Sequence, residues 1–314
     1  MIASRISLLL SAVLLTSSLR AQTIPAPQDS TTARLMQRLA TLSADSMEGR
    51  RTGTPGSARA RAWIVQQLKA MGARPAAGAF EMPFMFRGRG MAAGDSAAGV
   101  NIIARIPGRT PGGPVLVISA HYDHLGVRNG EVFNGADDDA SGCVAILTIA
   151  ERLLKDPPQH DVLVAFFDAE EMGLQGARAF VNAPPVPLAS IAANLNLDMV
   201  ARQDAGTLWV SGTSHSPFLK PLAEAASKAS GVAVRFGHDT KDLKPGDDWT
   251  GSSDHGAFHG KGIPFLYLGV EDHPDYHKSG DDAAKVDPAF YRSSVEFAAA
   301  LVRRLDAATG TFAR

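Results

Sequence analysis

The sequence predicts an α/β protein in which a central, mostly parallel mixed sheet lies between two layers of helices. Apolar, β-branched runs of strand length, such as VNIIARI (100–106) and VLVAFFD (162–168), alternate along the chain with helical segments. Alternation of this kind is typical of a twisted sheet that is covered on both faces. We find no internal repeat, so the order of the elements has to define the fold.

Two helices are predicted before the sheet, over residues 32–42 and 57–71, with Gly72 as a C-cap. Residues 76–99 show no clear period and are too few to form an inserted domain. The later elements are strands at 100–106, 114–121, 162–168, 194–200, 207–211 and 263–269, and helices at 144–154, 174–181 and 217–230. A last helix begins at Asp287, with Pro288 in its first turn.

The chain has 314 residues, of which 45% are hydrophobic, enough for one large domain. Arg5 and a short apolar stretch, followed by the small residue Ala21, predict a signal peptide over residues 1–21. Cleavage after Ser18 is the alternative. We expect a flexible leader at 22–31, one domain at 32–314, and a secreted or periplasmic protein with no stable membrane insertion after cleavage.

The charge balance and the single cysteine exclude several classes of protein. The formal net charge is −1, which gives no indication of a nucleic acid or an anionic membrane as partner. Cys143 is the only cysteine, so an intrachain disulfide and a thiolate metal site are both excluded. Any metal would have to be bound by histidines and carboxylates.

His121 and Asp123 stand two residues apart at the end of a predicted strand, in SAHYDH, and therefore point to the same face. The imidazole can bind a metal through one nitrogen while the carboxylate accepts the other N–H group and fixes the ring. The acidic loop GADDDASG follows, with Asp137, Asp138 and Asp139 just before a helix. One of the three can cap that helix, and another can bridge two cations.

Three further segments supply candidate ligands. Glu170 and Glu171 follow a buried strand, so one can bind a metal while the other acts as general base. Asp198 ends NLNLDMV, and His277 lies in a loop before the last helix, where His255 is its main rival. Because open α/β sheets build their sites at the carboxyl ends of strands, the set predicts a two-metal hydrolase: His121, Asp138, Glu171, Asp198 and His277.

These motifs, from LSADSMEGRRTGTPG through SAHYDHLG to YHKSGDD, resemble in their order the di-zinc aminopeptidases of peptidase family M28. The resemblance covers most of the chain after the signal peptide. It implies two Zn²⁺ ions bridged by Asp138, with Glu171 and His277 completing one site and His121 and Asp198 the other.

The resemblance also assigns three residues around the metals. Glu170 would activate a bridging hydroxide and later protonate the leaving amine, Asp123 would orient His121, and Tyr276 would hydrogen-bond the oxyanion. The segment 237–251 looks individual to this protein. It is placed at the rim of the substrate pocket with Trp249 as a wall, or is an ordinary solvated loop.

The leading hypothesis is a secreted aminopeptidase that acts on peptides with a free N-terminus. A carboxypeptidase or dipeptidase on the same scaffold would need cations in the pocket, for which Arg202, Lys241 and Lys244 are candidates. A glutaminyl-cyclase-like acyltransferase needs one zinc only, and a non-catalytic binding domain would lack ligands. The sequence leaves the oligomeric state and the preferred N-terminal residue open.

Overall fold

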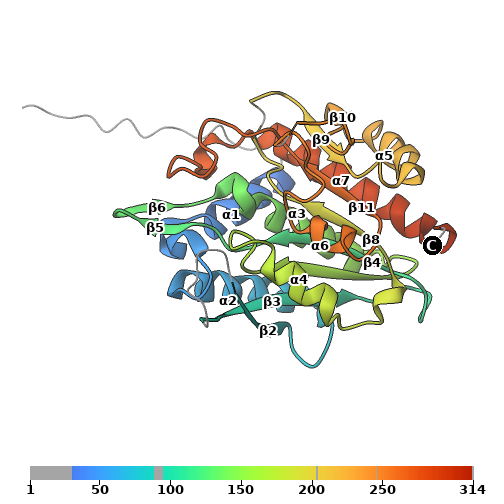
Figure 1. The fold of residues 1–314 in the computed structure, drawn as a ribbon, viewed down its shortest axis with the longest axis horizontal. Coiled ribbons are helices and arrows are strands. Elements are labelled where there is room, and N and C mark those ends of the chain that lie inside the picture. Colours follow the sequence, from blue (N-terminus) through green and yellow to red (C-terminus); the bar gives the residue numbers. More distant parts are fainter. Residues whose placement is uncertain (1–29, 88–94, 203, 245, 313–314) are drawn as a thin grey trace, which may run out of the picture.

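The computed structural model describes residues 30–87, 95–202, 204–244 and 246–312 (Figure 1). The predicted signal peptide and most of the predicted leader lie outside these residues. Helix α1 begins at Ser30, so it includes the last two residues of the leader predicted at 22–31. Among the described helices, none combines the length and the apolar composition that crossing a membrane requires.

One nine-stranded sheet organises the described chain, in the order β1-β3-β7-β4-β8-β11-β9-β10 with β2 paired to β3. The four central strands β7, β4, β8 and β11 are parallel, whereas β3 and β9 join them in antiparallel fashion. The strands of this sheet are β1 (Arg74–Pro75), β2 (Glu81–Phe86), β3 (Ala97–Ile106), β4 (Val115–His121), β7 (Asp161–Phe167), β8 (Ile191–Leu197), β9 (Leu208–Ser211), β10 (Val234–Phe236) and β11 (Phe265–Gly269). A separate hairpin consists of β5 (Gly126–Arg128) and β6 (Glu131–Phe133).

Helices cover both faces of the sheet, as Figure 1 shows. They are α1 (Ser30–Leu42), α2 (Pro55–Ala70), α3 (Gly142–Lys155), α4 (Gln175–Asn182), α5 (Lys220–Ser227), α6 (His255–His259) and α7 (Pro288–Ala308). Side chains alternate along each strand, so Val162 and Val164 of β7 pack with α3 and α7, whereas Leu163 and Ala165 pack with α4 and α6. The predicted fold class, a mostly parallel sheet between helical layers, is confirmed.

Two predictions of local structure were incomplete. Residues 76–99 contain β2, an edge strand whose side chains alternate between half-buried and exposed positions. Its apolar residues 82–86 include Pro83, which is confined to edge strands and bulges and therefore hides the strand in the sequence. The helix predicted at 217–230 is divided into a short 3₁₀ turn, Pro217–Leu219, and α5. Pro221 lies at the start of α5, where its missing N–H group costs no hydrogen bond.

Candidate metal centre

The five predicted metal ligands come from five segments that meet at one edge of the sheet. His121 is the last residue of β4, Asp198 follows β8 directly, and Glu171 lies in the turn after β7. His277 lies in the loop after β11, and Asp138 in an irregular helical turn, Ala136–Ser141, before α3. Because β4, β7, β8 and β11 are parallel, their carboxyl ends bring these side chains together.

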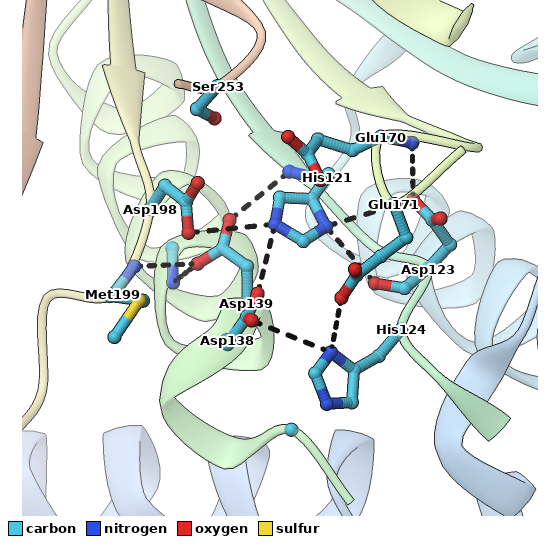
Figure 2. Close-up of polar contacts among 12 residues, drawn as sticks. His121, Asp123, His124, Asp138, Asp139, Glu170, Glu171, Asp198, Met199 and Ser253 are labelled. Atoms are coloured by element: carbon cyan, nitrogen blue, oxygen red, sulfur yellow. Dashed lines mark hydrogen bonds and ion pairs between the residues drawn. The ribbon is translucent and has the colours of Figure 1, made fainter. Parts of the chain in front are cut away.

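Asp138 lies between two groups of donors, of which Figure 2 shows His121, Asp198 and Glu171. Its Oδ1 is 3.2 Å from His121 Nε2, and that nitrogen is 3.5 Å from Oδ1 of Asp198. Its Oδ2 is 3.1 Å from His277 Nε2, which is 3.5 Å from Oε2 of Glu171. We call these the strand side (His121, Asp198) and the loop side (Glu171, His277). One carboxylate oxygen for each side is the arrangement that a bridging ligand requires.

The charges and the unpaired atoms of this site fit divalent cations. Burial alone would raise the pKa of Asp138, but the imidazoles of His124, His121 and His277 hold it well below its usual value. Oδ1 of Asp198 and Oε1 of Glu171 are buried and have no hydrogen-bond partner among the described residues. Since buried polar atoms are normally paired, a bound cation accounts for both. The histidine and carboxylate donors suit zinc.

The other two aspartates of the triplet have separate roles. Asp139 accepts a hydrogen bond from the Gly142 N–H group at 2.8 Å, at the start of α3, and another from the His121 N–H group at 3.1 Å. Asp137 accepts from the N–H group of Ala201 at 2.7 Å. Both carboxylates therefore fix the backbone around the site, and of the three Asp138 alone faces both donor groups.

Asp123 holds the site through its backbone as well as its side chain. Nδ1 of His121 is 3.1 Å from the Asp123 carbonyl oxygen, whereas the carboxylate Oδ1 is 3.7 Å away. That carboxylate instead accepts a hydrogen bond from the Glu170 N–H group at 3.0 Å. Asp123 thus links the orientation of His121 to the turn that carries Glu170 and Glu171.

Glu170 lies in the same cavity as the donor groups, half-buried beside Asp198 and His121. Burial raises the pKa of Glu170 well above its usual value; His121 opposes this shift, while Asp254 and Asp198 add to it. A raised pKa means that this carboxyl group holds a proton more readily than an ordinary carboxylate, which suits a group that takes up a proton and later releases it.

His255, the rival of His277, faces away from the donor groups. Its Nε2 donates to the Trp249 carbonyl oxygen at 2.7 Å, and its ring stacks on Phe265 with centroids 4.8 Å apart. Burial lowers the pKa of His255 to about 4, so the ring is neutral. Tyr276 lines the cavity and stacks on His277, with ring centroids 3.9 Å apart.

The sequence did not reveal Arg50, whose side chain holds the backbone on which His121 and Asp138 lie. Its side chain is fully buried and donates to the carbonyl oxygens of Tyr122 at 2.8 Å, Asn134 at 2.5 Å and Gly135 at 2.8 Å. One guanidinium therefore ties the end of β4 to the loop that leads into Asp138. The segment GRRTGTPG shows only turn-forming residues, and nothing in its pattern indicates burial.

His124 is the second residue that was missed. It is 1% exposed, and its Nδ1 lies 2.8 Å from Oε1 of Glu171 and 3.7 Å from Oδ2 of Asp138 (Figure 2). It stands one residue beyond the HxD pattern, in SAHYDHLG, and the pattern gives it no role.

A cavity of about 630 Å³ opens over the donor groups. Asp247 and Trp249 of the segment 237–251 line it, together with Glu271 and Asp272 after β11. Trp249 stacks on His238, with ring centroids 3.7 Å apart. The predicted position of this segment at the pocket rim agrees with the structure. Apart from histidines, the only cationic side chain among the described residues of the lining is Arg178.

Residues 101–302 match the model of peptidase family M28. The chain belongs to this family. Aminopeptidase YwaD of Bacillus subtilis is 31% identical over 152 residues, which are 48% of this chain and 30% of YwaD. Other curated relatives are matched over as little as 8% of their length, so the chain spans only part of the relatives that it matches.

Solved structures share the fold. The aminopeptidase from Aneurinibacillus sp. strain AM-1 has a TM-score of 0.71 at 17% identity, covering 86% of this chain and 93% of that one. The glutaminyl cyclase of Porphyromonas gingivalis has a TM-score of 0.70 at 20% identity, covering 86% and 97%. At these identities the likeness shows the architecture alone, and the two proteins are named for different activities.

Proposed function

We propose that this protein is an exported aminopeptidase that binds two zinc ions and removes N-terminal residues from peptides. The observation that carries the proposal is Asp138, which presents one oxygen to each of two donor groups beside a free carboxyl group, Glu170. The predicted signal peptide supports export. The likeness to YwaD and to other proteins named as aminopeptidases supports the reaction.

The residues divide the work of hydrolysis between them. His121 and Asp198 would hold one ion, Glu171 and His277 the other, and Asp138 both. Zinc, when bound there, supplies Lewis acidity for the scissile carbonyl and makes water acidic enough to attack at neutral pH. Glu170 takes a proton from the attacking water and delivers it to the leaving nitrogen as the C–N bond breaks. Tyr276, which lines the cavity, would donate a hydrogen bond to the carbonyl oxygen.

Electrostatics favour a substrate amine over a substrate carboxylate. Asp247, Glu271 and Asp272 add negative charge around the cavity. Arg202, Lys241 and Lys244, the cations expected for a carboxypeptidase, are not among the described residues of the lining, and Arg178 alone supplies a non-histidine cation there. The Arg202 guanidinium is instead held by Asp204 and Asp275 in ion pairs of 3.1 and 3.2 Å.

The decisive experiment compares amino-acid anilides that have a free amine with their N-acetylated forms, using the wild-type protein and Glu170→Gln. We expect hydrolysis of the free-amine substrates alone. The variant should lose about 10²–10⁴-fold in kcat while keeping its zinc, because Glu170 is a proton carrier and not a ligand. Equal rates on both substrate classes, or an active variant, would contradict the proposal.

A glutaminyl cyclase is the second candidate, because a solved cyclase has nearly the same TM-score as the aminopeptidase. The presence of donors for two ions argues against a reaction that needs one. Mass spectrometry of a peptide with N-terminal glutamine separates the two functions. A cyclase releases ammonia and keeps the residue, whereas an aminopeptidase releases glutamine.

A further inference from the structure

His124 is a buried imidazole without an ordinary structural partner. It leaves β4 three residues after His121, at the point where the chain turns toward β5, and its side chain is fully covered. Neither ring nitrogen makes a hydrogen bond to any described residue. A buried imidazole whose two nitrogens are both unpaired is costly, and therefore requires an explanation.

The contact between His124 and Glu171 has the wrong geometry for a hydrogen bond. Nδ1 of His124 is 2.8 Å from Oε1 of Glu171, yet both atoms remain unpaired because the approach is not aligned with the N–H direction. Nearby, Nδ1 is 3.7 Å from Oδ2 of Asp138. His124, Asp138 and Glu171 each offer one ligand atom, and these three atoms lie within 4.8 Å of one another, close enough to bind one cation.

The spacing of the donors also fits a single ion. Atoms bound to a tetrahedral zinc at about 2.0–2.2 Å are roughly 3.3–3.6 Å apart from one another. His124 Nδ1 lies 2.8 Å from Glu171 and 3.7 Å from Asp138, and His277 Nε2 lies 3.5 and 3.1 Å from the same two carboxylates, so these four separations are close to that range. The two imidazole rings have centroids 6.0 Å apart, so both can approach the carboxylates from different directions.

The surrounding backbone holds the His124 ring in this position. Gly135 has a φ of +55°, and a Cβ atom there would lie 2.5 Å from Cδ2 of His124. The carbonyl oxygen of Gly135 is in turn held by Arg50 at 2.8 Å. The ring therefore packs against a backbone segment that admits no side chain and is fixed by a buried guanidinium.

We propose that His124 Nδ1 is a fourth protein ligand on the loop side, beside Asp138, Glu171 and His277. The inference rests on the two-ion site of the proposed function. It makes the two ion sites unequal: the loop side has four protein donors, whereas the strand side has three (His121, Asp138 and Asp198) and an open position. Structural zinc sites are closed by four ligands, and catalytic sites keep one position open. The loop side should therefore fill first and bind more tightly.

The test is a zinc titration of the full-length, metal-free protein, followed by calorimetry and by NMR of ¹⁵N-labelled histidines. The variants are His124→Ala and His277→Ala, with His259→Ala, an exposed histidine on α6, as the matched control. We expect two classes of site in the wild type. In His124→Ala the tighter class should weaken by more than about 100-fold, the upper end of the effect of losing an outer-shell partner. The control should match the wild type.

The NMR spectrum separates a ligand from a positioning residue, and does not depend on the folding of the variant. The first equivalent of zinc should move the Nδ1 resonance of His124 in the wild-type protein to a metal-bound position. An unmoved Nδ1 resonance, or a His124→Ala variant with wild-type zinc affinities, would overturn the inference while leaving two-ion binding intact. A wild-type protein that binds fewer than two ions would instead refute the underlying two-ion proposal.

Discussion

The strand side and the loop side of the site are held in different ways. On the strand side, His121 is 1% exposed at the end of a central strand, and its N–H group is fixed by Asp139. On the loop side, the His277 side chain is 41% exposed, on a loop residue with a φ of +55°. The strand side is thus anchored throughout, whereas the loop side contains one weakly supported ligand, His277. The order of His277 would depend on the bound ion more than that of His121.

The strongest test of this comparison removes the residue that both sides share. Asp138→Asn should lower the zinc content below two ions and reduce kcat/KM by more than about 10³-fold, which exceeds the usual cost of one lost electrostatic contact. Metal analysis and anilide hydrolysis on the same sample provide the measurement. Asp95→Asn, on an exposed carboxylate outside the site, is the control. Full activity of Asp138→Asn would contradict the assignment of Asp138 as a ligand shared by the strand side and the loop side.

A second test removes Arg50, whose hydrogen bonds hold the backbone next to the strand side. Arg50→Met leaves several buried carbonyl oxygens without a hydrogen-bond donor, so the free energy of unfolding should fall by about 3 kcal/mol or more. Arg50→Lys keeps the charge but cannot reach all these carbonyls. Chemical denaturation measures the stability of Arg50→Met, and a zinc titration measures the metal affinity of Arg50→Lys. If the Lys variant folds and binds zinc like the wild type, Arg50 supports the fold only.

Acid should weaken the region around β11 through His255. Its folded-state pKa of about 4 lies below the unfolded value of about 6.5, so the neutral ring stabilises the fold above pH ~6.5. This contribution is lost as the pH falls through 4 and amounts to about 3 kcal/mol. Denaturation of the metal-free protein between pH 7 and 4 should show a smaller loss for His255→Phe than for the wild type. Parallel curves would contradict the assignment.

The smallest expected effect lies at the outer rim. Trp249→Ala removes an aromatic wall of the cavity, so KM should rise about fivefold, equivalent to ~1 kcal/mol, with kcat and zinc content unchanged. Phe218→Ala, an exposed aromatic elsewhere on the surface, is the control. A fall in kcat with constant KM would place Trp249 in the chemistry instead of in substrate binding.

The sequence predicts the ligands of the strand side better than the residues that hold the backbone around them. His121 and Asp198 could be identified because each lies at the end of an apolar run, and parallel topology then brings these strand ends together. Arg50 could not be, because its partners Tyr122 and Gly135 are 72 and 85 residues away and are backbone atoms that no pattern marks.

His124 illustrates the same limit on the loop side. Its neighbour Asp123 was predicted from the two-residue spacing of a strand, although β4 already ends at His121, and that spacing gives no role to His124, three residues after His121. Its position depends on the close approach of the Gly135 backbone, which is a property of the tertiary fold. The sequence left open whether the segment 237–251 lies at the pocket rim or is an ordinary solvated loop, and it gave no indication that Trp249 stacks on His238.

The measurement that tests the central claim most directly is anomalous diffraction at the zinc absorption edge from crystals of the zinc-loaded protein. The account predicts two peaks, one on each side of Asp138: the first among His121, Asp138 and Asp198, and the second among Asp138, Glu171 and His277. A single peak, or a peak that excludes Asp138, would contradict the two-ion centre on which the proposed aminopeptidase mechanism depends.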